Sequence, residues 1–194
     1  MAIVNMSASS RRNVKPTSST LKMTVEDIDC GAMTVAPEDG QFICVAGAAA
    51  ADDKGGADLV VDHANHADVT ANDPCMVWGS ALRSDRSALG DSRVPVIRNG
   101  GGRFRTKIFR VADDAQSLTA AANGYTPGAR LSLEKPSAAI EGTADRLILM
   151  PLSLHTAANA MCVGTVVRVV TDSRVAGTGE IEIQLWDSPR IETK

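Results

Sequence analysis

The sequence predicts an all-β protein: an antiparallel β-sandwich or small β-barrel with an extended N-terminal arm and one or two short helices. Short runs of about 4 to 8 residues alternate apolar and polar side chains, which is the pattern of a strand with one buried face. Gly, Pro and Asp separate these runs, as turn residues do. The long helical connections that parallel strands require are missing between the runs, so we expect antiparallel sheets.

The first 20 residues differ from the rest of the chain. Residues 1–20 are rich in Ser, Thr, Asn and Arg, and they show no periodicity that would bury one face. Alone, such a segment would be disordered, because nothing in it offsets the entropy of ordering it. Arg11, Arg12 and Lys15 make it locally basic in a chain of net charge -3. Two interpretations stay open: a mobile terminus, or an arm that lies on another subunit.

The length of 194 residues fits one domain with a sizeable core. We assign residues 1–20 to the extended N-terminal arm and residues 21–194 to a β-rich domain. A subdivision is possible near residues 99–102, where three consecutive glycines interrupt the chain.

Five segments in the first half of this domain have the strand pattern. They are residues 21–26, 41–45, 57–62, 75–78 and 94–98. The last of them carries Pro95, which cannot donate a hydrogen bond to a neighbouring strand. We therefore expect Pro95 on an edge strand or at a bulge.

Five more segments follow in the second half. They are residues 103–110, 128–134, 146–151, 163–170 and 179–186. In the last segment the apolar side chains at alternate positions are expected to point inward: Ile181, Ile183 and Leu185. The polar side chains between them are expected to face solvent or a neighbour: Glu180, Glu182 and Gln184.

Helix is a minor component of the prediction. One short helix is expected from Asp113 or Asp114, as the N-cap, to Ala122, and Gly124 would end it. A second is expected near residues 153–160.

Composition excludes several classes of function. Aromatic residues make up 3% of the chain, too few for the stacking surfaces on which single-stranded nucleic acids or sugars are bound. The net charge of -3 gives no overall attraction for a polyanion, so we expect no nucleic-acid partner. The sequence has no run of about 18 apolar residues and no pattern of a secretory signal, so we expect no membrane segment and no secretion.

Four cysteines are scattered along the chain at positions 30, 44, 75 and 162, without a CxxC spacing. Sparse, irregularly placed thiols are typical of small buried apolar side chains in a reducing compartment. We therefore expect the cysteines to be reduced and structural.

The strongest candidate for metal chemistry is the stretch 62–68, which holds His63, His66 and two aspartates. Histidines three residues apart can lie on one face of a helix and bind zinc or another transition metal. However, the stretch directly follows a predicted strand and has the composition of a polar loop. We interpret it as a loop and keep the metal site as the alternative.

Other patterns carry weaker signals. The glycines at 100–102 match neither a dinucleotide-binding loop nor a P-loop, and the chain has no GxSxG elbow. His155 precedes Cys162 by seven residues, but nothing nearby in sequence indicates a thiol of lowered pKa. The acidic pairs at 52–53 and 113–114 are better explained as loops and caps than as acid-base catalysts. We assign no catalytic, cofactor-binding or metal-binding residue and expect neither an enzyme nor a cofactor.

Four segments of the second half form a pattern. They are GRFRTKIF at 102–109, PGARLSL at 127–133, VGTVV at 163–167 and EIEIQL at 180–185. This pattern, over roughly residues 100–188, resembles the head decoration, or capsid cement, proteins of tailed bacteriophages.

What this resemblance implies is a structural virion protein, made in the host cytoplasm and placed on the capsid exterior. It would bind the outer surface of the assembled capsid as a trimer or dimer and bridge neighbouring major capsid subunits, with residues 1–20 reaching over the shell. The alternatives are another non-enzymatic phage part, such as a tail, fibre or baseplate β-domain, and a small metal-dependent hydrolase that uses His63 and His66.

Overall fold

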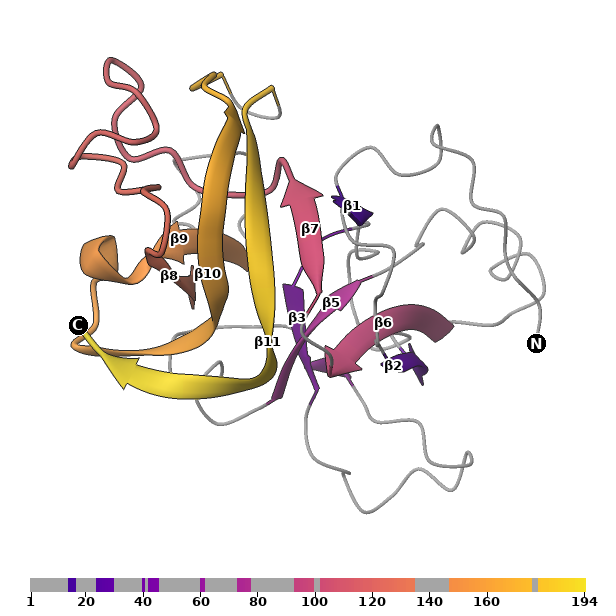
Figure 1. Cartoon of the computed structure of the whole chain (residues 1–194). Coiled ribbons are helices and arrows are strands. Elements are labelled where there is room, and N and C mark those ends of the chain that lie inside the picture. Colours follow the sequence, from indigo (N-terminus) through magenta and orange to yellow (C-terminus); the bar gives the residue numbers. More distant parts are fainter. Residues whose placement is uncertain are drawn as a thin grey trace.

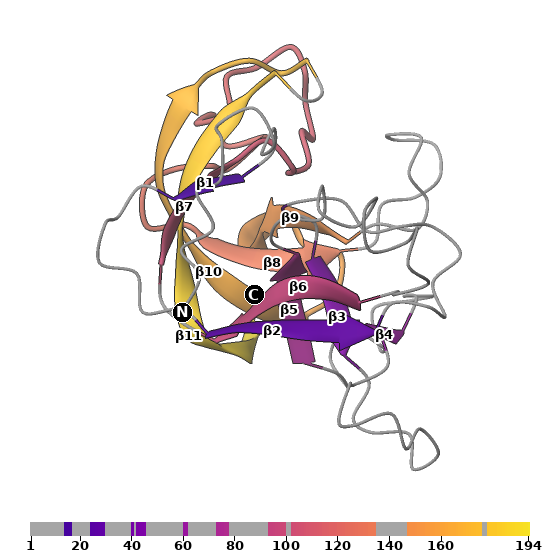
Figure 2. The ribbon, with the colours of Figure 1, turned by 90° about the vertical axis from the view of Figure 1, so that its right-hand side faces the viewer.

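The computed structural model describes residues 14–16, 24–29, 40, 42–45, 60–61, 73–77, 93–99, 102–134, 147–175 and 178–194. These residues form eleven strands and one short 3-10 helix, arranged as two antiparallel sheets (Figures 1 and 2). The prediction of an all-β fold with sandwich-like sheets is therefore confirmed, and neither sheet closes on itself to make a barrel.

The larger sheet has six strands in the order β1-β7-β11-β10-β8-β9. Their bounds are Val14–Pro16 (β1), Arg103–Thr106 (β7), Glu180–Thr193 (β11), Asn159–Thr171 (β10), Arg130–Glu134 (β8) and Ile148–Pro151 (β9). At its centre β10 and β11 form one long hairpin, which stands upright in Figure 1. This hairpin is the frame to which the other strands of the sheet attach.

The smaller sheet has five strands in the order β2-β6-β5-β3-β4. Their bounds are Thr24–Asp29 (β2), Arg93–Asn99 (β6), Asp73–Val77 (β5), Phe42–Val45 (β3) and Val60–Val61 (β4). Phe42 forms a single β-bridge with Leu147 next to the larger sheet. The main core joins the two sheets, because Phe42, Met76 and Ile97 of the smaller one cluster with buried residues of the larger one.

All ten predicted strand segments overlap a strand of the structure, β2 to β11. The alternation in β11 is also confirmed: Ile181 and Ile183 are fully buried and Leu185 is 6% exposed. Glu182 has a neighbour, since its carboxylate accepts a hydrogen bond from Nε of Arg168 at 2.8 Å.

β1 was not predicted. It lies within the segment that has no periodicity, and it pairs with β7 at the edge of the larger sheet, with Val14 opposite Thr106 and Pro16 opposite Phe104. An edge strand is held by main-chain hydrogen bonds on one side only, so its formation depends on a neighbour and leaves little trace in its own side-chain pattern.

Pro95 lies on an inner strand, since β6 is between β2 and β5, and the expectation of an edge strand is wrong. However, β5 pairs with β6 only at Val96 and Ile97. At Pro95 the described ladder continues on the β2 side alone, opposite Asp27. The residue that lacks an N–H thus lies where the strand has one partner.

The predicted helix over 113–122 is wrong, because this segment is a succession of turns. Its backbone is organised by Asn123, which is fully buried. The Asn123 Oδ1 accepts hydrogen bonds from the N–H groups of Ala112 and Asp113, both at 2.9 Å. Its Nδ2 donates to three carbonyls of the segment, at distances from 2.7 to 3.1 Å. A side chain therefore takes the place of the helical hydrogen-bond ladder.

The second predicted helix, near 153–160, is reduced to one 3-10 turn, η2 (Leu152–Leu154), and the chain enters β10 at Asn159. The turn residue Gly124 does have the left-handed φ that a helix-ending glycine needs, at 69°. Within the described residues, no helix has the length and apolar character needed to cross a membrane.

Candidate interaction surface

The two histidines proposed for metal binding lie outside the described residues, as does the whole stretch 62–68. The metal site at His63 and His66 therefore stays the untested alternative to a polar loop, and elemental analysis of the purified protein and of the variant with both histidines changed to Ala would test it. Among the described side chains, no group of three or more His, Cys, Asp or Glu residues could hold a metal ion.

The third histidine, His155, is a buried structural residue, 1% exposed. The N–H of Ala157 donates to its Nδ1 at 3.1 Å, so the ring proton is on Nε2, which donates to the carbonyl of Leu133 at 3.2 Å. The ring thus links the segment after η2 to β8. Both ring nitrogens contact the backbone, which leaves neither directed at solvent as a general base.

Cys162 and Cys75 are buried, and neither forms a disulfide within the part of the chain that the structure describes. Burial, aided by the negative charge of Glu192, raises the pKa of the Cys162 thiol from 9.0 to about 11, although Arg130 and Arg190 oppose the shift. The thiol is therefore protonated at neutral pH and is a poor nucleophile.

We expect Cys162 to be alkylated by iodoacetamide at about pH 8 at least about tenfold more slowly in the folded protein than in urea, as followed on its peptide by mass spectrometry. The pKa of the Cys162 thiol is higher in the folded protein than in the unfolded one. Its contribution to the free energy of unfolding is therefore complete below pH 9.0 and is lost as the pH rises toward about 11. Equal alkylation rates in the two states would contradict this burial.

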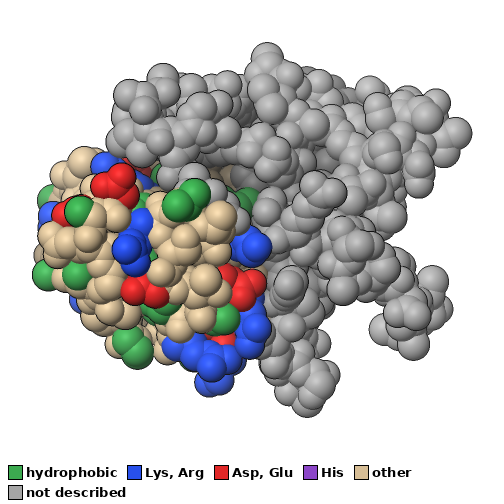
Figure 3. Space-filling model, turned by 90° about the horizontal axis from the view of Figure 1, so that it is seen from above, with side chains coloured by type: hydrophobic (Ala, Val, Ile, Leu, Met, Phe, Trp, Pro, Cys, Tyr) green, Lys and Arg blue, Asp and Glu red, His purple; other side chains and the backbone are tan. Residues whose placement is uncertain are grey.

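An exposed apolar side chain lies close to the tip of the β10–β11 hairpin. Val175 is 68% exposed. Its carbonyl accepts a hydrogen bond from Thr178 Oγ1 at 2.8 Å, and Asp172 Oδ1 accepts one from the N–H of Leu118 at 2.8 Å. The tip is thereby tied to the turn segment. In Figure 3, which looks at this end of the molecule, apolar side chains lie singly or in small groups between charged ones.

The base of the hairpin carries the second large exposed apolar side chain of the described residues, Ile191, at 54% exposure. Ile191 pairs with Met161 of β10, which belongs to the main core. Ile191 therefore lies on the core-side face of the sheet, where that face reaches solvent.

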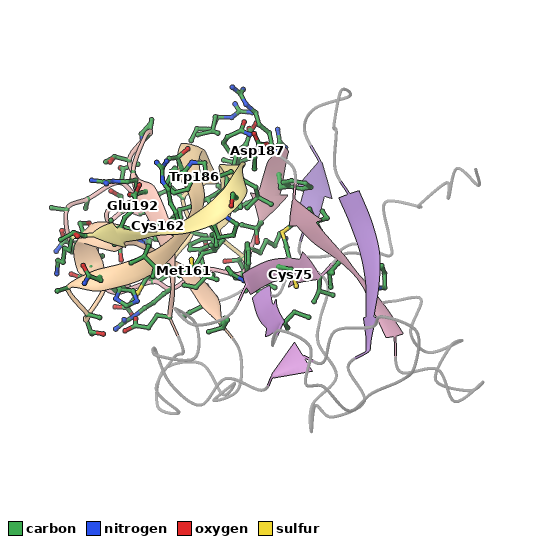
Figure 4. The ribbon with its side chains drawn as sticks, turned by 90° about the horizontal axis from the view of Figure 1, so that it is seen from below. Cys75, Met161, Cys162, Trp186, Asp187 and Glu192 are labelled. Atoms are coloured by element: carbon green, nitrogen blue, oxygen red, sulfur yellow. The ribbon has the colours of Figure 1, made fainter. Side chains whose placement is uncertain are left out.

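The opposite face of the sheet at the same place carries a second apolar cluster. Main-core residues Met161 and Val163 alternate along β10 with Ala160 and Cys162, so these two point to the other face. There they pack with Leu152, and Trp186 of β11 covers the cluster. Figure 4 shows Cys162, Trp186 and Glu192 along this stretch of β10 and β11.

A bulge in β11 places Trp186 over the cluster. Leu185 pairs with Gly164 and Arg190 pairs with Cys162, so residues 186–189 of β11 lie opposite a single residue of β10. The bulge contains Pro189, which cannot donate to the ladder. Pairing with β10 resumes after the bulge, from Arg190 to Thr193.

One arginine stacks on the tryptophan and shares a carboxylate with a second arginine. The Arg190 guanidinium carbon lies 4.3 Å from the Trp186 ring centroid, a cation-π contact. Its Nε donates to Glu192 Oε1 at 2.8 Å, and Nη1 of Arg130 donates to Glu192 Oε2 at 2.6 Å. We call Trp186, Arg190, Glu192 and Arg130 the Trp-Arg patch.

Glu192 is the centre of charge in the Trp-Arg patch. Burial alone would raise the pKa of its carboxyl group, but the hydrogen bonds and charges of Arg130 and Arg190 outweigh burial and lower the pKa below its usual value. Glu192 is therefore ionised at neutral pH, and the two guanidinium groups share its single negative charge.

An open hollow lies on each side of the Trp-Arg patch. One, of about 760 Å³, is lined by Gln184, Asp187, Ser188 and the patch residues Trp186 and Arg190. The other, of about 560 Å³, has a lining that includes Ala129, Leu152, Arg130 and Lys194. Residues of the Trp-Arg patch thus line both hollows, and Trp and Arg are residue types that dominate protein-protein contacts.

The Trp-Arg patch was not predicted from the sequence. The loss of alternation after Leu185, together with Pro189, is a local signal that could have indicated a bulge. In contrast, Arg130 and Glu192 are 62 positions apart, and no spacing rule connects them.

Comparisons of the chain with protein-family models, with curated proteins and with solved structures give no match.

Proposed function

We propose that this chain is a structural virion protein that binds the outer surface of an assembled phage capsid and stabilises it by bridging major capsid subunits. The observation that carries the proposal is the long β10–β11 hairpin, which has an exposed apolar side chain toward each end: Val175 near the tip and Ile191 at the base. The resemblance of residues 100–188 to cement proteins points to the same role.

The span of the hairpin suits a bridge between two neighbours. About ten residues of β10 separate Met161, the partner of Ile191, from Thr171 at the tip. At about 3.3 Å per residue the two ends lie roughly 30 Å apart. The two strands pair along most of their length, and this pairing keeps the two ends of the hairpin apart. Contacts made at the two ends can therefore fall on two different subunits.

The energetics of this role require no deep pocket. A protein that binds the assembled lattice and not the free subunits shifts the equilibrium toward the shell. Many copies in symmetric positions, each a trimer or dimer in this proposal, add avidity to weak single contacts. The arm of residues 1–20 would reach over the shell, and β1, which belongs to this arm, is paired with β7 at the sheet edge.

The direct test is to mix the purified chain with empty shells assembled from the major capsid protein it is proposed to bind. We expect the chain to co-sediment with the shells and to raise the temperature at which they disassemble, measured by light scattering. Shells that neither retain the protein nor gain heat resistance would refute the proposal.

Val175→Asp and Ile191→Asp are each expected to weaken shell binding by about tenfold or more. Burying a Val or Ile side chain contributes about 1.5–3 kcal/mol, and a buried unpaired carboxylate adds a further cost. The melting temperature should change little because both side chains are exposed in the free protein.

Thr119→Asp serves as the charge control, because it adds the same charge at an exposed polar position of the turn segment and changes neither apolar side chain. It is expected to bind like the unmodified chain. If the control variant lost as much affinity as the other two, the effect would reflect net charge and not the apolar contacts.

A further inference from the structure

We propose that the Trp-Arg patch recognises an acidic peptide segment of the partner protein, in which a Glu or Asp side chain is flanked by an apolar one. This inference rests on the proposed function, because it names the chemistry by which one of the contacts with the shell subunit is made. Its occupant is a segment of another protein and not a free ion.

Charge is the first reason. Two guanidinium groups share one carboxylate in the Trp-Arg patch, so the patch carries one uncompensated positive charge in a chain of net charge -3. Lys194 Nζ, which donates to the carbonyl of His155 at 3.2 Å, adds a positive charge on the lining of the 560 Å³ hollow, and Asp187 adds a negative charge on the lining of the other hollow. This surface therefore attracts a group of opposite sign to the patch, although the protein as a whole is acidic.

Unused donors are the second reason. A guanidinium has five N–H donors in a planar fork. Glu192 accepts hydrogen bonds from Nε of Arg190 and from Nη1 of Arg130. The side chain of Arg190 is 65% exposed and that of Arg130 is 52% exposed. The remaining donors can bind a second carboxylate, in the bidentate geometry that guanidinium groups favour. Glu192 itself holds the two groups close together, at 2.8 Å and 2.6 Å from its oxygens.

The hollows are the third reason, since they provide for an apolar neighbour of the acidic side chain. In the 560 Å³ hollow the described lining includes Ala121, Ala129 and Leu152 and no acidic residue. Arg130 lines this hollow and also contacts Glu192. A side chain placed there would lie directly beside a carboxylate bound to Arg130, so one short peptide can fill both positions.

A polyanion fits this surface less well. Nucleic acids and anionic membranes bind to broad basic surfaces, whereas Glu192 stands within the patch and Asp187 lines the neighbouring hollow. The mixture of one net positive charge, an aromatic ring and small apolar hollows matches a protein segment.

The test compares four forms of the full chain for binding to empty shells, at low and at high salt. They are the unmodified chain, the double variant Arg130→Gln/Arg190→Gln, Glu192→Gln, and Arg168→Gln as the matched control. Arg168 makes the same kind of bond, Nε to a glutamate oxygen at 2.8 Å, and its side chain is 58% exposed. Thermal unfolding of each form checks that the fold is retained.

We expect the double variant to lose about tenfold or more in affinity at low salt and less at high salt, because exposed charge contacts are screened. Glu192→Gln should bind more tightly, since glutamine keeps an oxygen that can accept from the guanidinium groups but removes the negative charge that competes with the carboxylate of the peptide. The control should match the unmodified chain. Equal binding by the double variant would overturn the inference while leaving the proposed function intact.

A second measurement separates the two proposals. Fluorescence of the tryptophans is recorded while the chain is titrated with an octapeptide that has two central glutamates flanked by leucines, and with the same peptide carrying glutamines. Preference for the glutamate peptide, lost in the double variant, supports the inference even if shells are not bound. An equal fluorescence response to both peptides would overturn the inference. So would tighter binding of the chain to phosphatidylglycerol vesicles than to the glutamate peptide, if the double variant loses that vesicle binding.

Discussion

Gly164→Ala is expected to destabilise the protein by about 3 kcal/mol or more and to lower the yield of folded chain. A Cβ atom at position 164 would lie 2.3 Å from the carbonyl oxygen of Gln184 and 3.2 Å from Cα of Leu185. Both atoms belong to the backbone of β11, so a rotamer change cannot relieve the contact. The two central strands would have to separate, which disrupts the frame of the larger sheet.

The free energy of unfolding, measured from urea titrations of the variant and the unmodified chain, checks this expectation. Gly128→Ala is the matched control. Gly128 has a φ of 85°, and a Cβ atom there would have no neighbour within 4 Å, so only backbone strain of about 1–2 kcal/mol is expected. If Gly164→Ala lowered the free energy of unfolding no more than Gly128→Ala does, β10 and β11 would be able to adjust to the added Cβ atom. This result would contradict the closely paired hairpin on which the bridging proposal depends.

Asn123→Ala is expected to have the second largest effect, also about 3 kcal/mol or more. The side chain is fully buried and makes five hydrogen bonds to the backbone. Alanine would leave the N–H groups of Ala112 and Asp113 without this acceptor and would remove the donor to three carbonyls. Those carbonyls belong to Asp113, Gln116 and Ser117.

Asn123→Asp refines the test, because aspartate keeps the acceptor for the two N–H groups but points an oxygen at the three carbonyls. We expect it to be at least as harmful as alanine. Asn159→Ala is the control: Asn159 is exposed and accepts one hydrogen bond, from Thr193 Oγ1 at 3.0 Å, so its loss should stay within about 0.5 kcal/mol. If all three variants unfolded at the same urea concentration, the turn segment would not depend on Asn123.

The hairpin tip connects this turn segment to the proposed function. The N–H of Leu118 donates to Asp172 Oδ1, and Nε of Arg174 contacts the carbonyl of Asp114 at 3.4 Å. Loss of Asn123 would therefore loosen the support of Val175 as well as the turn itself. We expect the folded fraction of Asn123→Ala to bind shells more weakly than its stability alone explains.

The strands could be predicted from the sequence because alternation reports the burial of one face directly. Ile181 and Ile183 are buried, as the pattern in 179–186 predicts. The helix at 113–122 could not be distinguished from a series of turns, because an acidic cap and a closing glycine occur in both. The deciding contact there comes from Asn123, a residue just outside the predicted element.

The candidate surface was less accessible to sequence reasoning. His155 and Cys162 are close enough in sequence to suggest a shared site. In the structure the histidine holds backbone groups, and burial keeps the thiol protonated. The Trp-Arg patch has no counterpart among the predicted sites, since its members come from β8 and from two sides of a bulge in β11.

The all-β class, part of every strand from β2 to β11 and the inward direction of Ile181, Ile183 and Leu185 follow from the amino-acid order alone, because they depend on the period of two between neighbouring side chains. The meeting of Arg130 with Glu192, the ordering of the turns by Asn123 and the pairing of residues 14–16 are set only in the folded protein. These contacts join distant or irregular segments, and they form only after the sheets have brought their partners within hydrogen-bonding distance.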